Sequence, residues 1–306
     1  MTSGYSNDYS TLYKSPEGYA ALMANYDAHL AWLGATTPYE SITVNTRFGF
    51  THVLITGPKD APPLVLLPSP FIGMAVGWKR YISRFSKEYR VYAFDLIGGI
   101  GKSAPTRLAY NTLDYAIWLL DVIYALNLGP AGYIGTLTGC WLLLKLATLA
   151  PSQIAKAVLV APIGLLSLTP SKSFRAKLYA ILAQFFPTRK TITRSLRENI
   201  APASMLTQEI FREAVEILLL CYKYYKFPAV PKPLSEFEQA RLTAPTLLLD
   251  GEYNALYKPQ ELVAQARRVL PNLRAAEIVP NAGSAILDEQ PAWATERILR
   301  FLREGN

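Results

Sequence analysis

Residues 133–141 read YIGTLTGCW, and the interpretation of the whole chain depends on this stretch. A short apolar run enters a Gly-x-x-x-Gly motif formed by Gly135 and Gly139, and a leucine-rich stretch follows it. The pattern predicts a sharp turn from a buried strand into a helix, which presents its central residue. A nucleophilic site would need Ser, Cys or Asp at that position. The residue is Leu137, which has no nucleophilic atom.

Strands and helices are predicted to alternate on both sides of this turn. Apolar runs closed by Pro or Gly are typical of strands buried on both faces of a parallel sheet, and they occur at 63–70, 89–98, 131–137, 156–164, 245–252 and 274–283. Apolar residues at helical spacing predict helices at 111–127, 138–150, 257–270 and 291–304. We therefore expect an α/β fold with a doubly wound, mostly parallel sheet.

Two segments depart from this alternation. The first, 1–39, is an N-terminal extension in which residues 15–34 have helical spacing, and a predicted hairpin around Phe48-Gly49 follows it. The second, 167–240, has a helical pattern and is too long for an ordinary crossover. We expect 167–240 to be a helical cap, inserted in a core formed by 40–166 and 241–306.

The composition favours a large folded domain. Of the 306 residues, 51% are hydrophobic and 18% are charged, which allows a sizeable core. The two cysteines make no disulfide framework, and the first residues lack the pattern of a signal peptide. No apolar run reaches the roughly 18 residues of a membrane span. These features predict a cytoplasmic protein.

Five motifs in matching order give the chain a resemblance to the α/β-hydrolase superfamily. They are PLVLLPSPF at 63–71, VYAFDLIGGIGKS at 91–103, YIGTLTG at 133–139, TLLLDGEYN at 246–254, and VPNAGSAILDEQPAWATERILRFL at 279–302. The resemblance covers nearly the whole chain from about residue 40. It implies the α/β-hydrolase fold, with its nucleophile turn at 133–139.

The resemblance also implies a Ser-Asp-His triad, and each of its positions holds another residue. The nucleophile position is Leu137, the acid position is Asn254 and the histidine position is Ser284. Pro68-Ser69 replaces the usual His-Gly of the oxyanion loop. The prediction is a degenerate, non-catalytic triad.

No other side chain in the sequence supplies the missing chemistry. Both histidines, His29 in the first predicted helix and His52 in the hairpin, are expected to be structural or exposed. We expect Thr136 and Thr138 to hydrogen-bond the turn, and Cys140 to stay protonated. Ligand spacing for a metal is absent from the sequence, and we expect neither a metal nor a cofactor. Without a base, the protein is expected not to be a serine hydrolase.

An apolar pocket with a few polar groups is expected where the triad would lie, and it suits an apolar small molecule. The cap segment 211–228 carries tyrosines that either cover this pocket or pack on the core. The predicted substrate-binding residues are Leu137, Asn254, Ser284, Pro68, Ser69, Phe71, Thr136, Thr138, Tyr222 and Tyr225.

Charge is concentrated in one part of the cap. The net charge is +8, and residues 171–198 include seven basic residues and one acidic residue. A basic rim around an apolar entrance predicts docking of an acidic carrier domain or an anionic membrane surface, with a plainly solvated face as the alternative. No segment resembles a nucleic-acid-binding module, and no nucleic-acid partner is expected.

Two classes of function stay open. The first is a non-hydrolytic, cofactor-independent enzyme of hydrolase ancestry, which promotes a cyclisation, isomerisation or elimination of secondary metabolism as a cyclase, isomerase or lyase. The alternative is a catalytically inactive pseudo-hydrolase that binds a ligand or partner. A buried titratable group in the pocket would favour the enzyme. The candidates for such a group are Glu252, Tyr253, Tyr257, Asp288, Glu289 and Asp95.

Overall fold

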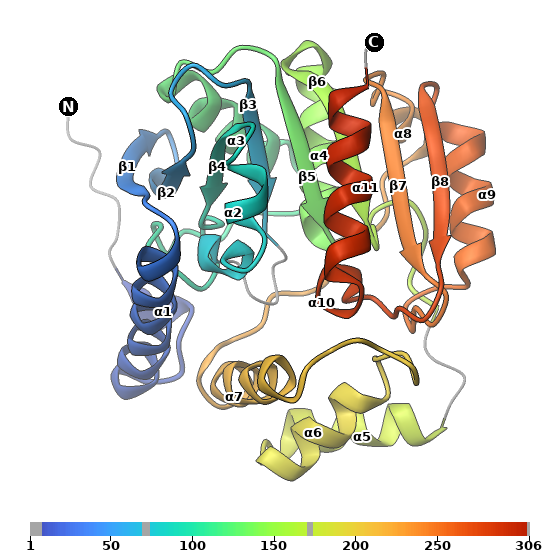
Figure 1. Cartoon of the computed structure of the whole chain (residues 1–306). Coiled ribbons are helices and arrows are strands. Elements are labelled where there is room, and N and C mark those ends of the chain that lie inside the picture. Colours follow the sequence, from blue (N-terminus) through green and yellow to red (C-terminus); the bar gives the residue numbers. More distant parts are fainter. Residues whose placement is uncertain (1–7, 69–73, 170–173, 305–306) are drawn as a thin grey trace.

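One eight-stranded sheet organises the chain. The computed structural model describes residues 8–68, 74–169 and 174–304 (Figure 1). The strands are β1 (Glu40–Thr46), β2 (Gly49–Thr56), β3 (Pro63–Leu67), β4 (Arg90–Phe94), β5 (Ala131–Thr136), β6 (Ile154–Val160), β7 (Thr246–Gly251) and β8 (Leu273–Val279). Their order in the sheet is β1-β2-β4-β3-β5-β6-β7-β8. Only β2 runs antiparallel to its neighbours β1 and β4, so the predicted mostly parallel sheet is confirmed.

Helices cover both faces of this sheet. The α-helices are α1 (Pro16–Thr36), α2 (Ile82–Phe85), α3 (Asp114–Ala125), α4 (Thr138–Leu149), α5 (Phe174–Phe185), α6 (Arg189–Arg197), α7 (Gln208–Tyr224), α8 (Glu236–Gln239), α9 (Pro259–Val269), α10 (Ile286–Glu289) and α11 (Pro291–Arg303). Side chains of a strand alternate between the faces. Leu64 and Leu66 of β3 therefore join the core beneath α1 and α11, while Val65 and Leu67 join the core beneath α3, α4 and α9.

Helices α5, α6 and α7 lie apart from the sheet, beyond the carboxyl ends of its parallel strands (Figure 1). They fall within the predicted cap segment. The fourth helix of that segment, α8, packs on α4, where Lys145 Nζ and Glu238 Oε1 are 2.9 Å apart. We call α5–α7 the cap. None of the helices within the described residues has the length and hydropathy required to cross a bilayer.

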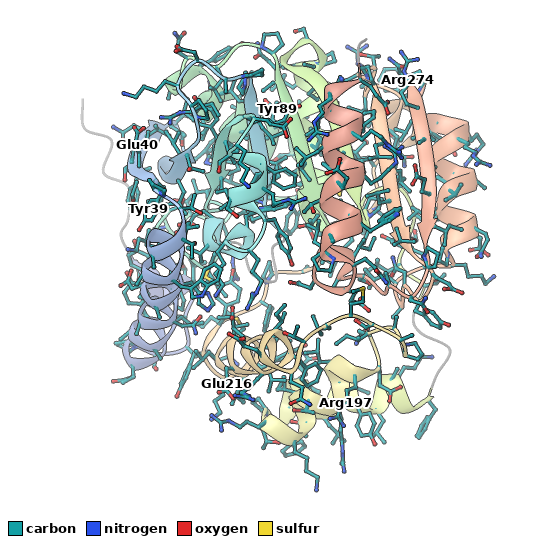
Figure 2. The ribbon with its side chains drawn as sticks, viewed as in Figure 1. Tyr39, Glu40, Tyr89, Arg197, Glu216 and Arg274 are labelled. Carbon is teal, nitrogen blue, oxygen red and sulfur yellow. The ribbon has the colours of Figure 1, made fainter. Side chains whose placement is uncertain are left out.

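The N-terminal helix α1 supports the cap through its contact with α7. Gly18 lies so close to α7 that an added Cβ would be 2.6 Å from Cβ of Tyr224. Ion pairs complete the contact, because Glu213 of α7 lies 2.7 Å from Lys79 Nζ and 3.3 Å from His29 Nε2. His29 therefore has a structural place between α1 and α7. Tyr39 and Glu40, labelled in Figure 2, lie between the C-terminal end of α1 and the start of β1.

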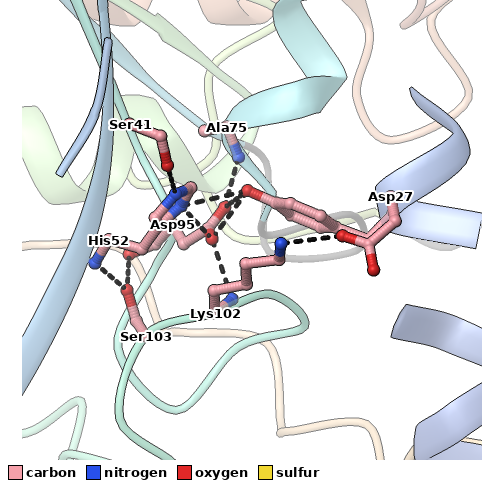
Figure 3. A network of polar contacts seen from close by, with 8 residues as sticks. Asp27, Ser41, His52, Ala75, Asp95, Lys102 and Ser103 are labelled. Atoms are coloured by element: carbon pink, nitrogen blue, oxygen red, sulfur yellow. Dashed lines mark hydrogen bonds and ion pairs between the residues drawn. The ribbon is translucent and has the colours of Figure 1, made fainter. Parts of the chain in front are cut away.

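A buried carboxylate, Asp95, ties α1 and β2 to the loops that follow β3 and β4 (Figure 3). It accepts hydrogen bonds from the Tyr26 hydroxyl at 2.9 Å and from the amides of Ala75 and Lys102 at 2.6 and 2.8 Å. His52 Nδ1 lies 2.9 Å from the same carboxylate. Four partners from separate segments satisfy the hydrogen-bonding capacity of this fully buried group.

We predict that Tyr26→Phe lowers the free energy of unfolding by about 2 kcal/mol, because Asp95 stays buried and loses a hydroxyl donor. Chemical denaturation measures this change. Tyr124→Phe is the matched control, since Tyr124 is 62% exposed, and we expect its effect to stay within about 0.5 kcal/mol. Equal stabilities of the Tyr26 variant and the control would contradict the anchoring role of this network.

Candidate functional site: a cleft above a strained elbow

The turn between β5 and α4 has the geometry of a nucleophile elbow. Leu137 has φ 49° and ψ −113°, a conformation that is rare for a bulky side chain and costs about 1–3 kcal/mol. Both glycines of the motif are needed for space. A Cβ on Gly139 would lie 2.5 Å from the Leu67 carbonyl oxygen, and one on Gly135 would lie 2.8 Å from the Cys140 amide nitrogen.

Backbone hydrogen bonds to β6 and its following loop hold the elbow. The Leu137 amide donates to the Val160 carbonyl at 3.0 Å, and the Ile163 amide donates to the Leu137 carbonyl at 3.0 Å. Cys140 lies under the turn, where its thiol donates to the Gly135 carbonyl at 3.0 Å. Burial raises the pKa of Cys140, so this thiol stays protonated and is not a nucleophile.

An apolar cleft of about 300 Å³ opens above the elbow. Pro68, Thr136, Leu137 and Val160 contribute the strand-end side of its lining. Leu196, Ala214 and Leu218 of the cap lie on the opposite side, and the remaining walls are formed by Met74, Gly77, Trp78, Tyr81 and residues 284–288. The cap thus closes the cleft with aliphatic side chains.

The acid and histidine positions of the resemblance meet next to this cleft. Ser284 Oγ donates to Asn254 Oδ1 at 3.0 Å, and Asn254 Nδ2 donates to Asp250 Oδ1 at 2.5 Å. Burial raises the pKa of Asp250 to about 6, although the hydrogen bond from Asn254 opposes this shift. The other carboxylate oxygen of Asp250 has no hydrogen-bond partner among the described residues. Ser284 itself lines the cleft.

A second carboxyl group, Asp288, lines the cleft directly. The Tyr81 hydroxyl donates a short hydrogen bond to its Oδ1. Burial raises the pKa of Asp288, and the hydrogen bond from Tyr81 acts against that rise. A carboxyl group with a raised pKa in a cleft is a stronger base than an ordinary carboxylate and is suited to accept and return a proton. The loop position of Asp288 makes it a candidate from the sequence, whereas no sequence motif indicates the contact that Tyr81 makes with it.

The structure brings some predicted binding residues together and separates others. Pro68, Thr136, Leu137 and Ser284 line the cleft, and Asn254 lies behind Ser284. Thr138 faces a small hollow beside Tyr115 and Trp141 instead. Ser69 and Phe71 lie outside the described residues.

Tyr222 and Tyr225 are not among the described residues that line the cleft. The Tyr225 hydroxyl donates to the Gly98 carbonyl at 3.3 Å, and its ring packs on Tyr13 and Phe227. Tyr222 packs among cap residues and on Phe227. Their contacts support the packing interpretation of segment 211–228, because α7 turns aliphatic residues toward the cleft.

The described residues contain a Ser-His-Asp arrangement elsewhere, at the edge of the sheet (Figure 3). Ser41 Oγ lies 2.8 Å from His52 Nε2, and His52 Nδ1 lies 2.9 Å from Asp95 Oδ2. The distances match those of a catalytic triad. Ser41 is on β1 and is not among the described residues that line the cleft, and Asp95 is held by loop amides. We therefore assign this network to the stability of the fold.

An elbow after the fifth strand, a cleft above it and a cap between strands six and seven define the α/β-hydrolase class. The family described as "alpha/beta hydrolase fold" matches residues 62–201. Carboxylesterase YbfK of Bacillus subtilis (strain 168) is 30% identical over 280 residues, which are 87% of this chain and 88% of that protein. The chain belongs to the α/β-hydrolase superfamily, within which it is related to carboxylesterases.

Further similarities agree with this relationship. The uncharacterized carboxylesterase nap of the same bacterium is 29% identical over 272 residues, 86% of each chain. The crystal structure of carboxylesterase CesB (YbfK) superposes with a TM-score of 0.78 at 28% identity and covers 95% of this chain and 100% of that one. The structure of naproxen esterase, also from Bacillus subtilis, has a TM-score of 0.77 at 27% identity, with 92% and 97% covered.

These relatives correct the predicted function. The prediction of a non-hydrolytic cyclase, isomerase or lyase is wrong, because relatives that match most of the chain are named carboxylesterases. The same finding contradicts the alternative of an inactive pseudo-hydrolase and the exclusion of the serine hydrolases. That prediction rests on the side chains at three positions, whereas the similarity to carboxylesterase YbfK extends over 87% of this chain.

We predict that Asp250→Asn removes a pH-dependent loss of stability. A carboxyl group whose pKa rises on folding, here from 3.8 to about 6, stabilises the fold least when it is ionised. The stability of the variant relative to the wild type should rise by roughly 2–3 kcal/mol between about pH 4 and pH 7. Denaturation across this range measures it, with the exposed Asp60→Asn as control. A difference that does not change with pH would contradict the raised pKa.

Proposed function

We propose that the protein hydrolyses carboxylic esters that carry an apolar acyl or alcohol group and bind in the Leu137 cleft. The observation that carries the proposal is the strained elbow, which keeps φ 49° at a leucine beneath an apolar cleft. Strain of this kind persists where the surrounding structure demands it, and it is concentrated at functional sites. The carboxylesterase relatives support esters as the substrate class.

In this proposal the side chains at the three triad positions contact the substrate. The Leu137 side chain makes apolar contact with the substrate in the cleft. The Ser284 hydroxyl is engaged with Asn254, and a carboxamide cannot take up its proton as an imidazole would. Asn254 stands between Ser284 and the buried Asp250 carboxyl group, so no base is in contact with the Ser284 hydroxyl among these three residues.

A water molecule is then the attacking group, and Asp288 is the base. Among the described residues that line the cleft, Asp288 is the one with a carboxyl group. Its raised pKa strengthens it as a proton acceptor. Tyr81, which donates to Asp288, is a positioning residue that fixes the orientation of the carboxylate. The Thr138 amide at the start of α4 is suited to receive the developing oxyanion, because helix N-terminal amides lack helical acceptors.

The proposed reaction has two proton transfers. The water oxygen bonds to the ester carbonyl carbon while Asp288 takes a proton from that water, and the carbonyl oxygen becomes an oxyanion. The tetrahedral intermediate then collapses, the bond to the alcohol oxygen breaks, and Asp288 returns its proton to the leaving alkoxide. The products are a carboxylic acid and an alcohol, and the carboxylate of Asp288 is restored.

We predict that Asp288→Asn lowers kcat for p-nitrophenyl butyrate by about 10²–10⁴-fold, because the amide cannot accept the proton from water. Asp60→Asn is the matched control and should retain the wild-type rate, since Asp60 lies on an exposed loop. Tyr81→Phe should shift the acidic limb of the pH–rate profile to higher pH, because loss of the hydrogen bond from Tyr81 raises the pKa of Asp288 further.

Two results would overturn this proposal. The first is the absence of ester hydrolysis by the wild-type protein. The second is stoichiometric labelling by a fluorophosphonate, which requires an activated side-chain nucleophile. Mapping the label to Ser41 would transfer the reaction to the edge of the sheet, and mapping it to Ser284 would transfer it to the other wall of the cleft.

A further inference from the structure

Helix α5 has an apolar stripe on the side that faces away from the protein. Phe174, Leu178, Ile181 and Phe185 follow one another at spacings of four, three and four residues, so they share one side of the helix. These side chains are between 39% and 79% exposed. Ala183, on the opposite side, is fully buried in a cluster with Ile192 of α6 and Val215 of α7. The helix therefore keeps its small residue inside and its large apolar residues outside, the reverse of an ordinary surface helix.

The apolar stripe is accompanied by a concentration of positive charge. Residues 174–197 include six lysines and arginines and no aspartate or glutamate. Lys177, Lys190 and Arg194 are exposed. Arg189, Arg197 and Arg212 line a hollow of about 870 Å³ between α6 and α7, together with Glu216, which pairs with Arg189 at 2.9 Å. Figure 2 labels Arg197 on this part of the cap, away from the sheet.

We propose that the outer side of α5 docks on an anionic lipid surface. A short helix with exposed phenylalanine, leucine and isoleucine, flanked by lysine and arginine, is suited to lie in the interface between water and lipid. Its 12 residues are too few to span a bilayer. The positive charge of α5 and α6 complements anionic headgroups, whereas a second copy of the same chain would bring like charges together. This inference does not depend on the proposed hydrolysis.

Docking through α5 would place one side of the cleft near the lipid. Leu196 of α6 belongs to the same basic segment and lines the cleft. A protein attached through α5 would hold this side of the cap at the lipid, where apolar esters accumulate. The docked surface itself lies outside the cleft, since the residues of the stripe are not among those that line it.

Flotation with lipid vesicles tests this proposal. We expect the wild-type protein to float with vesicles of phosphatidylcholine and phosphatidylglycerol and to remain unbound with pure phosphatidylcholine. The triple variant Phe174→Ser/Ile181→Ser/Phe185→Ser should lose at least about tenfold in partition coefficient, because its apolar contacts are removed. Phe237→Ser is the matched control, since Phe237 is 78% exposed on α8, and it should bind as the wild type does. High salt should weaken the binding.

Three outcomes would overturn the proposal. They are no binding of the wild type to anionic vesicles, binding that the triple variant retains, and a concentration-dependent dimer that the triple variant abolishes. The last outcome would show that α5 is covered by a second copy. Because the stripe is exposed, the triple variant should keep the wild-type melting temperature, and circular dichroism checks that it is folded.

Discussion

The close approach of α4 to β3 determines the geometry of the turn at Leu137. Gly139 lies so close to the Leu67 carbonyl that an added Cβ would be 2.5 Å from its oxygen, and the turn from β5 into α4 is made at Leu137. That residue takes a left-handed φ, which is unfavourable for leucine. The turn fixes where β5 ends, where α4 begins and where the cleft opens, and its geometry does not require a reactive side chain.

The cap is held over this cleft from two sides. On one side, Glu213 of α7 is paired with Lys79 and His29, and α1 packs against α7. On the other, the fully buried Glu289 accepts from the amides of Ala201 and Gly283, both at 2.8 Å. The N-terminal helix and the loop after β8 thus act together on the cap. The shape of the cleft therefore depends on these contacts as well as on the sheet.

Much of the fold could be predicted from the sequence, because buried parallel strands leave continuous apolar runs. The positions of Leu137 and Ser284 at one cleft followed from the motif order. Contacts between distant segments left no such pattern. Tyr81 and Asp288 are 207 residues apart and meet only after folding. The direction of Tyr222 depends on how α7 is rotated, and that of Tyr225 on the extended backbone at the end of α7, and spacing alone determines neither.

A crystal structure with an alkyl aryl ketone would show whether the cleft above Leu137 binds the ester. Such a ketone has the carbonyl group of an ester but no bond that water can hydrolyse. We expect its alkyl chain to contact Leu137 and Leu218 and its oxygen to accept a hydrogen bond from the Thr138 amide. A ketone bound outside this cleft, with the oxygen beside Ser41 and His52, would contradict the account.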